Sequence, residues 1–265
     1  MESKTIFITG AGSGIGKDVA FDLSRRGHRV IATTETHEQA NALQGEASQK
    51  NILLTVYKLD TTLENDRKSI ERYLDIDVLI NNAAIGESGS LADIDMNVVR
   101  RSFEVNVFAA LELTKLALKN IMKRGKGNII FISSTAGRIV VPFLGPYAMT
   151  KFALSSGAEA LRNEMHLLNK NIFISLVEPG AYHTGFNQRM VQSQLLRMNT
   201  ESYFYPLREK ITSRLETMFY LIEVQSTQSI VRAIVRAAES QHPRLRYVAP
   251  WWQGLGVRIL RIMGK

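Results

Sequence analysis

The chain contains 265 residues, of which 45% are hydrophobic and 22% are charged, and its formal net charge is +8. A chain of this length can bury roughly 70 to 75% of its unfolded surface, so the composition predicts a globular protein with a sizeable core. The absence of cysteine excludes disulfides, zinc–thiolate sites, iron–sulfur clusters and thiol nucleophiles. It also suits a reducing compartment, and we expect a cytoplasmic location.

No targeting or membrane-spanning segment is expected. The first four residues lead directly into the apolar run at residues 5–9, without the charged start and long apolar stretch of a secretory signal. The longest apolar runs, such as residues 129–132, have the length of a strand. Crossing a bilayer needs roughly 18 to 20 apolar residues, so we expect no transmembrane helix.

The positive charge is concentrated at the C-terminus. Residues 240–265 contain no acid, and they supply five of the eight excess charges through Arg244, Arg246, Arg258, Arg261 and Lys265. The rest of the chain therefore carries only about +3, which argues against a nucleic-acid-binding domain. The five histidines show no metal-binding spacing, and no metal site is predicted.

Short runs of β-branched and apolar residues alternate with longer segments of helical periodicity along the chain. The strand-like runs are residues 5–9, 29–33, 52–57, 78–81, 128–133, 172–177 and 246–249. This alternation predicts an α/β fold with a Rossmann-like, doubly wound, seven-stranded parallel sheet and helices on both faces. Without an evident linker or repeat, residues 1–265 are expected to form a single domain. A lid segment is expected at about 181–220 and a basic tail at about 242–265.

A glycine-rich segment follows the first strand and begins the first helix. Gly10, Gly14 and Gly16 are spaced Gly-x-x-x-Gly-x-Gly, which differs from the usual Gly-x-Gly-x-x-Gly fingerprint. Glycines allow a pyrophosphate to approach the backbone, and a helix N-terminus offers unpaired N–H groups. The alternative is a structural turn, but the position after a strand favours a nucleotide site.

Tyr147 and Lys151 form the second chemical motif. Their i, i+4 spacing in a predicted helix places the phenol and the ammonium on one face. A neighbouring cation favours the ionised phenol, so this pair is suited to proton transfer. Ser134 ends the strand at residues 128–133, and strand C-termini are where doubly wound sheets place their sites. Taken singly, each residue also has an ordinary structural explanation.

Together these motifs resemble the short-chain dehydrogenase/reductase family, in its single-domain subgroup of about 250 residues. The resemblance covers nearly the whole chain, and its motifs occur in family order. The sequence departs from the family motifs at two positions, Ala84 and Ala109, where the family commonly has glycine. Each change adds a single methyl group. The motifs are Thr9-Gly10-x-x-x-Gly14-x-Gly16, Asp60, Asn81-Asn82-Ala83-Ala84, Asn106, Ser134, Tyr147-x-x-x-Lys151 and Pro179-Gly180-x-x-x-Thr184.

The resemblance implies four catalytic residues. Tyr147 is expected to exchange the proton of the substrate oxygen as general acid or base, and Ser134 to hydrogen-bond the same oxygen. Lys151 is expected to lower the pKa of Tyr147 and to bind the nicotinamide ribose. Asn106 is expected to hold a water that links Lys151 to solvent. These roles imply a nicotinamide-dependent oxidoreductase that acts on CH–OH or C=O groups.

The resemblance also implies a cofactor site for NAD or NADP. The expected binding residues are Gly10, Ser13, Gly14, Ile15, Gly16, Thr34, Glu35, Asp60, Asn82, Ala83, Tyr147, Lys151, Pro179, Gly180 and Thr184. The segment at residues 30–49 contains no lysine or arginine, and Glu35 would meet a 2′-phosphate with like charge. NAD is therefore favoured, although the hydroxyls of Thr33 and Thr34 or a distant arginine leave NADP open.

The substrate is expected to be apolar. Methionines and aromatic residues crowd the lid segment and the approach to Tyr147, and such side chains adapt to bulky apolar ligands. A sterol, a retinoid or a lipid-like alcohol or ketone is the predicted class, although packing between two lid helices explains at least half of these residues. The residues concerned are Val140, Val141, Phe143, Leu144, Phe186, Met190, Val191, Leu195, Leu196, Met198, Tyr203, Phe204, Tyr205, Met218, Phe219 and Tyr220.

The tail carries both tryptophans, Trp251 and Trp252. A helix over residues 251–263 places Arg258, Arg261 and Lys265 on one side and Leu255, Ile259 and Ile262 roughly opposite. One interpretation is weak peripheral contact with an anionic membrane. The favoured interpretation is docking on the lid or on a second subunit.

Two other functions were weighed against the oxidoreductase. A non-catalytic dinucleotide sensor would need only the nucleotide pocket. The presence of all four catalytic residues therefore argues against a sensor. An epimerase or dehydratase of the related extended enzymes would usually have a longer chain and a different glycine spacing. A homodimer or homotetramer is expected through the helices near residues 98–124 and 147–169, as in related enzymes.

Overall fold

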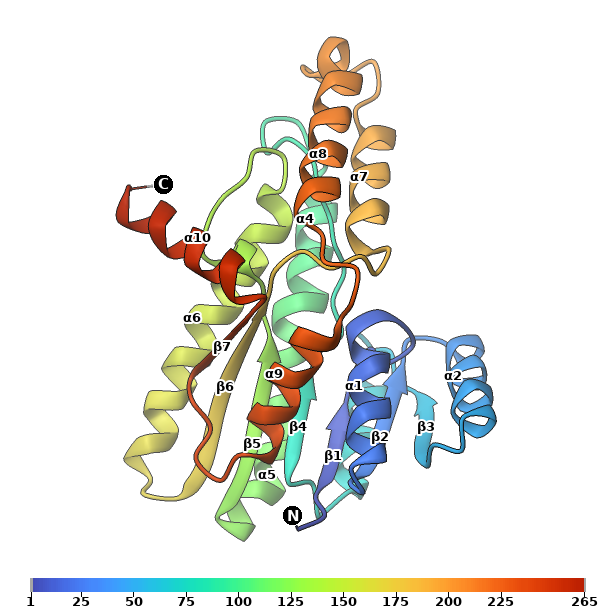
Figure 1. Cartoon of the computed structure of the whole chain (residues 1–265), viewed down its shortest axis with the longest axis vertical. Helices are drawn as coiled ribbons and strands as arrows, with labels where there is room; N and C mark the ends of the chain where they lie inside the picture. Colours follow the sequence, from blue (N-terminus) through green and yellow to red (C-terminus); the bar gives the residue numbers. More distant parts are fainter. Residues whose placement is uncertain (1, 265) are drawn as a thin grey trace.

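Seven strands form one parallel sheet in the computed structural model, which describes residues 2–264 (Figure 1). The order across the sheet is β3-β2-β1-β4-β5-β6-β7, and each neighbouring pair is parallel. All seven predicted strands are confirmed. Their bounds are β1 Thr5–Ile8, β2 Arg29–Thr34, β3 Leu54–Lys58, β4 Val78–Asn81, β5 Lys126–Ile132, β6 Asn171–Pro179 and β7 Arg246–Ala249.

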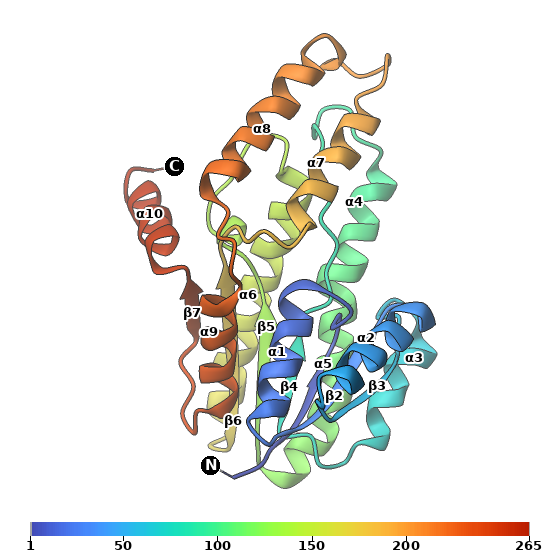
Figure 2. The same ribbon diagram turned by 45° about the vertical axis from the view of Figure 1, so that its right-hand side comes forward.

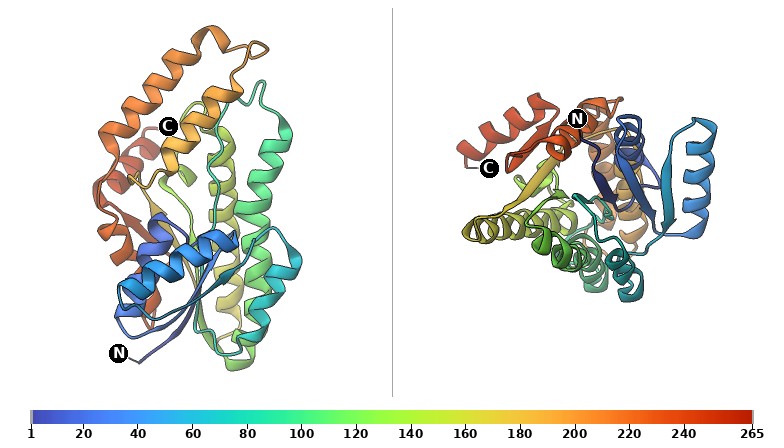
Figure 3. Two further views of the ribbon diagram at one scale, coloured as in Figure 1. Left: turned by 90° about the vertical axis from the view of Figure 1, so that its right-hand side faces the viewer. Right: turned by 90° about the horizontal axis from the view of Figure 1, so that it is seen from below.

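Helices cover both faces of this sheet (Figures 2 and 3). Side chains of α1, α2 and α9 share one apolar core with the sheet, and side chains of α5 and α6 share the other. The predicted doubly wound α/β fold is therefore confirmed. The helices are α1 Gly14–Arg25, α2 His37–Gln49, α3 Glu64–Lys68, α4 Met96–Phe103, α5 Ala109–Arg124, α6 Gly145–Leu167, α7 Phe186–Arg197, α8 Arg208–Ile222, α9 Gln228–Glu239 and α10 Trp251–Ile262.

Burial on both faces of the sheet explains why the last three residues of β1, Ile6, Phe7 and Ile8, are all apolar. Ile6 and Ile8 belong to the core under α1 and α9, whereas Phe7 belongs to the core under α5. Successive side chains of a strand point to opposite faces, so a strand covered on both sides must be apolar throughout. This burial holds the carboxyl ends of the strands in a rigid row.

The chain reverses its direction of winding at β1. β1 pairs with β2 on one side and with β4 on the other, so the loops that follow β1 and β4 diverge to opposite faces. Open parallel sheets bind ligands in the crevice that forms outside the strand ends at such a point. The glycine-rich segment, which joins β1 to α1, lies at this crevice.

The predicted lid segment projects beyond the sheet as the helix pair α7 and α8 (Figure 1). A small separate core joins it to the start of α6, with Leu144, Met190, Leu215 and Phe219 as buried members. Some predicted lid residues are instead exposed: Leu196, Tyr203 and Tyr220. Packing in this core therefore accounts for part of the apolar pattern of the lid, which is the second of the two explanations that the sequence allows.

The basic tail forms β7 and then α10, which extends away from the body of the molecule (Figure 1). Gly254 and Val257 of this helix are buried, but Leu255, Ile259 and Ile262 are not. The tail contacts the end of the lid through Gln253, whose Nε2 donates to the carbonyl oxygen of Ile222 in α8, whereas docking on a second subunit stays a prediction. Lys265 lies outside the described residues. Within residues 2–264, none of the helices has the length and apolar character needed to cross a membrane.

Candidate active site

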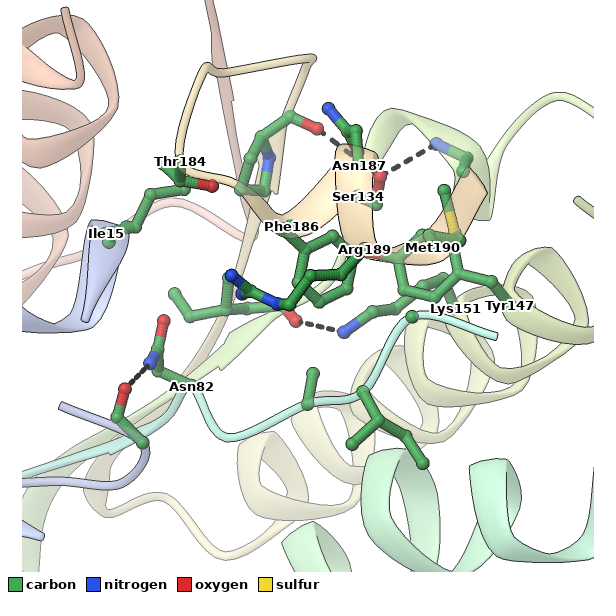
Figure 4. A pocket seen from close by; sticks show the side chains of 18 of the residues that line it. Ile15, Asn82, Ser134, Tyr147, Lys151, Thr184, Phe186, Asn187, Arg189 and Met190 are labelled. Carbon is green, nitrogen blue, oxygen red and sulfur yellow. Dashed lines mark hydrogen bonds between the residues drawn. The ribbon is translucent and has the colours of Figure 1, made fainter. Parts of the chain in front are cut away.

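A cavity of about 1080 Å³ lies at the carboxyl ends of the strands and extends under α7 and α8. Of the predicted catalytic and cofactor-binding residues, all but Asn106 and Thr34 line it. Figure 4 shows how Ile15, Asn82, Ser134, Tyr147, Lys151 and Thr184 converge on this space from separate elements. The volume is at the upper end for small-molecule sites, which suits a dinucleotide together with a substrate.

The glycine-rich segment forms a tight cradle at the N-terminus of α1. Gly10 and Gly14 have φ values of +65° and +54°, a region that disfavours residues with side chains. A Cβ atom on Gly16 would lie 2.4 Å from both the carbonyl oxygen of Gly10 and Nδ2 of Asn82. Only glycine fits this position, and the open backbone suits an approaching pyrophosphate.

Asn82 braces this cradle from β4. Its Nδ2 donates to the carbonyl oxygens of Thr9 and Gly10, both at 2.9 Å. The Thr9 hydroxyl in turn accepts from the backbone N–H groups of Asn82 and Ala83, both at 3.1 Å. These bonds join the ends of β1 and β4 across the switch point. The Nδ2 group of Asn82 therefore shapes the cradle, and the expected contact of Asn82 with the cofactor stays a prediction.

Ser134, Tyr147 and Lys151 meet at the other end of the cavity. Lys151 Nζ donates to the carbonyl oxygen of Ile132 at 2.9 Å and lies 5.5 Å from the centre of the Tyr147 ring. Ser134 Oγ accepts from the N–H of Ala136 at 3.1 Å. The predicted i, i+4 pair on α6 therefore faces the strand end that carries Ser134 (Figure 4).

Burial dominates the electrostatics of this group. It raises the pKa of Tyr147 to about 12, despite a hydrogen bond with Ser134 that lowers it. Burial also lowers the pKa of Lys151 to about 7. A neutral amine does not attract a phenolate, so the expected lowering of the Tyr147 pKa by Lys151 is outweighed in the protein alone.

Asn106 does not reach the cavity. It lies in the π-helical segment Glu104–Phe108 between α4 and α5, and it is 1% exposed. Its Oδ1 accepts from the N–H of Ile85 at 2.8 Å, while its Nδ2 donates to the carbonyl oxygen of Ile85 at 2.9 Å and to Thr150 at 3.0 Å. The Thr150 hydroxyl donates to the carbonyl oxygen of Tyr147 at 2.7 Å. Asn106 therefore anchors the helix turn that carries Tyr147.

The far end of the cavity is lined by Glu35, Gln39 and Asp60. Gln39 Oε1 accepts from the backbone N–H of Glu35 at 3.1 Å. This bond does not involve the carboxylate of Glu35. Thr34 is fully buried, and its hydroxyl donates to the carbonyl oxygen of Thr36 at 2.9 Å. The structure thus brings Glu35 to the cavity but not Thr34, whose buried hydroxyl is used in the turn that follows β2.

Two arginines in the cavity wall were missed by the sequence analysis. Arg101 comes from α4 and Arg189 from the first turns of α7. Arg189 is exposed, points into the cavity in Figure 4 and lies against Gly185, one residue after Thr184. A Cβ atom on Gly14 would lie 3.3 Å from Cβ of Thr184, so the start of the lid lies next to the glycine cradle here. The apolar pattern of the lid carries no signal for a single cation such as Arg189, because one charged residue has no periodicity.

The apolar part of the wall comes from the lid and from the loop before α6. Phe186 packs on Tyr147 with ring centres 5.6 Å apart. Met190, Met218 and Phe219 also line this part, together with Val141 and Leu144. Phe143 instead packs edge-on against Phe204 at 5.2 Å, outside the cavity wall.

Comparison with known proteins identifies the family. The model of the short chain dehydrogenase family matches residues 4–195. The chain is 33% identical to the uncharacterized oxidoreductase YusZ of Bacillus subtilis, over 98% of this chain and 93% of the relative. It is 33% identical to human retinol dehydrogenase 8, over 92% and 80%. A 3-ketodihydrosphingosine reductase of Bacteroides thetaiotaomicron is 32% identical, over 76% and 72%.

Solved structures show the same fold. A short-chain dehydrogenase of Streptomyces avermitilis has a TM-score of 0.80 at 24% identity, covering 99% of this chain and 93% of that chain. Another from Sphingobium yanoikuyae, in complex with NADPH, has a TM-score of 0.74 at 22% identity, with coverage of 99% and 96%. A third, from Burkholderia phymatum in complex with NAD, has a TM-score of 0.79 at 19% identity, with coverage of 97% and 92%. The chain therefore belongs to the short-chain dehydrogenase family of NAD(P)-dependent oxidoreductases.

Proposed function

We propose that this protein interconverts an alcohol and a ketone or aldehyde on an apolar substrate, with NAD as the preferred cofactor. The observation that carries the proposal is that Ser134, Tyr147 and Lys151 line the same cavity as the glycine cradle of α1. A dinucleotide sensor needs the cradle but has no use for a buried phenol and amine beside it. The oxidoreductase therefore accounts for more of the cavity than the sensor does.

The bound nicotinamide would supply or accept a hydride at the substrate carbon. In reduction, the Tyr147 hydroxyl gives its proton to the carbonyl oxygen as that oxygen gains electron density. A pKa of about 12 keeps Tyr147 protonated at neutral pH, as a general acid must be. In oxidation Tyr147 must first lose its own proton to solvent, and the phenolate oxygen then receives the proton of the alcohol while the hydride leaves for the nicotinamide.

The neighbouring side chains orient this proton transfer. Ser134 donates a hydrogen bond to the reacting oxygen and stabilises the charge that develops there. Lys151 is oriented by the carbonyl oxygen of Ile132, which directs its amine along the cavity toward the expected ribose hydroxyls. Asn106 acts through Thr150 on the position of Tyr147. In this respect the proposal replaces the water-holding role that the family resemblance implied for Asn106.

The preference for NAD is supported by the charge at the adenosine end. Glu35 lines the cavity at the end of β2, where a carboxylate can accept hydrogen bonds from two ribose hydroxyls. A 2′-phosphate at about 4 Å from it would lose up to a few kcal/mol at an effective dielectric near 20. Arg189 lies on the lid near Gly14 rather than beside Glu35. We propose that it binds the pyrophosphate, which both cofactors share.

The substrate class is supported by the lid and by the relatives. Phe186, Met190, Met218 and Phe219 present apolar surface next to Tyr147. The names of two relatives, retinol dehydrogenase 8 and 3-ketodihydrosphingosine reductase, both describe enzymes of long apolar alcohols or ketones. We propose a substrate of this kind. A cytoplasmic location remains a prediction that rests on the sequence, which contains no cysteine.

The test combines cofactor titration with a Tyr147→Phe variant. NADH is expected to bind more tightly than NADPH, measured by the fluorescence of the bound nicotinamide. Tyr147→Phe should retain NADH binding within about twofold and lose roughly 10²- to 10⁴-fold in kcat on a panel of long-chain ketones. Tyr203→Phe, at an exposed tyrosine of the lid, is the matched control and should keep full activity. If neither nucleotide binds, the proposal is wrong.

A further inference from the structure

The outer face of α10 is entirely apolar. Trp251, Leu255, Ile259 and Ile262 recur at intervals of four and three residues, which aligns them along one side of the helix. Trp251 is 74% exposed and Ile262 86%, and Leu255 and Ile259 are each 49% exposed. Trp252 and Met263 border the same side and are also exposed. We call these six residues the α10 apolar face.

The opposite side of α10 is the one that packs on the protein. Gly254 and Val257 are buried there, and Gly254 lies against Val248 of β7. Gln253 Oε1 accepts from the N–H of Ala181 at 2.8 Å, and its Nε2 donates to the carbonyl oxygen of Ile222 at 2.7 Å. The helix is thus fixed in orientation by its inner side. Its apolar face is therefore held outward. Large exposed apolar patches on proteins usually mark a binding surface.

Charge indicates what covers this face. Arg258 borders it next to Trp251 and Ile262, whereas Arg261 lies on the side of Gly254 and Val257, at the exposed end of α10. Residues 240–264 contain no acid, so in a symmetric dimer through this face neither copy of α10 would offer an acid to the arginines of the other. An anionic lipid surface instead provides the opposite charge, and tryptophan side chains favour the boundary between lipid and water.

The length of the helix fits binding along a surface. α10 has 12 residues, about 18 Å at 1.5 Å per residue, which is far short of the roughly 30 Å of a bilayer core. An amphipathic helix of this kind lies in the interface, with its apolar side in the lipid and its cations at the headgroups. The body of the protein then remains in water.

The same helix contributes to the wall of the cavity. Gln253 and Leu260 line the cavity from α10, and Met218 and Ile222 line it from the neighbouring end of α8. Through Gln253, α10 is also bonded to the segment that follows β6, where Gly180 lies. A surface bound to α10 therefore lies next to the part of the cavity assigned to the apolar substrate.

We propose that α10 docks this protein on an anionic lipid surface through its apolar face, with Arg258 and Arg261 contacting the headgroups, next to the substrate end of the cavity. The docking places a substrate dissolved in the bilayer near its binding site. The membrane contact depends on α10 alone, whereas the delivery of substrate rests on the proposed function.

The two tryptophans of the chain, Trp251 and Trp252, both lie on this face, so intrinsic fluorescence reports its environment directly. Vesicles of phosphatidylcholine with about one third phosphatidylglycerol should shift the emission to the blue and should carry the protein through flotation. Arg258→Gln with Arg261→Gln should weaken the binding roughly 10- to 30-fold, since each cation near an anionic surface contributes about a factor of five. Vesicles of phosphatidylcholine alone should bind much less.

Matched variants separate this face from general stickiness. Leu255→Ser with Ile259→Ser should abolish flotation, whereas Leu53→Ser, at a leucine that is 88% exposed elsewhere, should leave it unchanged. The proposal is overturned if anionic vesicles change neither emission nor flotation. It is also overturned if the blue shift grows with protein concentration in the absence of lipid, which would mean that a second copy covers the face. Both readouts need neither cofactor nor substrate, so they are independent of the proposed activity.

Discussion

Lys151 is a cation that the fold almost completely removes from water, with only 2% of its surface exposed. Its pKa falls from 10.5 to about 7 because burial penalises the charged form. Between these two values the unfolded chain binds a proton that the folded protein does not, so stability should rise with pH from about 7 to 10.5. Below pH 7 the buried amine is charged in the folded protein, so the free energy of unfolding is lowered by the full cost of burying this charge.

This penalty predicts that Lys151→Met stabilises the protein while abolishing activity. Allowing for the lost hydrogen bond to Ile132, the gain at pH 6.5 should be roughly 2 to 4 kcal/mol, falling to about 1 kcal/mol or less at pH 9.5. Urea unfolding at the two pH values measures the difference. A gain that is equal at both pH values would show that the pKa of Lys151 is not lowered.

Arg189 offers a second test at the level of one side chain. It lies on the lid beside Gly185 and points into the cavity (Figure 4). If it binds the pyrophosphate, Arg189→Ala should weaken the binding of NADH and of ADP roughly 10- to 150-fold and leave that of adenosine unaffected, because a hydrogen bond to a charged group contributes about 1.5 to 3 kcal/mol. Arg232→Ala on α9 is the control. Equal binding of ADP by both variants would remove Arg189 from the cofactor site.

Glu178 connects three elements under the active site. Its side chain is fully buried in β6 and forms ion pairs with Arg246 of β7 and with Arg138, which follows the turn after Ser134. Without Glu178, Arg138 loses its acidic partner, whereas Arg246 keeps its ion pair with Glu159, and both arginines are partly exposed. The loss of these charge-assisted hydrogen bonds is expected to cost about 1 to 3 kcal/mol. Glu178→Ala should lower the unfolding free energy by this amount in urea titrations. Glu216→Ala, at an exposed glutamate of α8, should change it by less than about 0.5 kcal/mol.

At the scale of the whole molecule, the expected oligomer remains a prediction. The helices assigned to it, α4 with α5 and α6, carry exposed apolar side chains at Phe108 and Met149, which are 50% and 41% exposed. If they bury these residues between subunits, Phe108→Glu should convert a dimer or tetramer into smaller species in light scattering, because it places a charge in an apolar contact. A wild-type protein that is monomeric at micromolar concentration would contradict the prediction.

Most of the architecture could be predicted because its signals are local. The seven strands were found from β-branched runs, with ends correct to within a few residues. The glycine spacing located the cradle, and the i, i+4 spacing of Tyr147 and Lys151 placed both on one face of α6. These features depend on the periodicity of one element and on residues close in the chain.

The rest depends on contacts between distant segments. Packing between separate segments decides three features of the site. These are the burial of Thr34, the hydrogen bonds between Asn106 and Ile85, and the position of Arg189. The pKa values of Tyr147 and Lys151 depend on burial, which no spacing reveals. The direction of α10 was equally undecided, since an amphipathic pattern does not say which side meets the protein.

The sequence by itself therefore determined the fold class, the family and the residue types available for chemistry, because periodicity and motif spacing are written along the chain. Only the tertiary structure decided which of these side chains reach the cavity, which are consumed by internal hydrogen bonds, and that the α10 apolar face stays outward. The physical reason is that burial and hydrogen-bond partners belong to the packed molecule, where residues more than a hundred positions apart become neighbours.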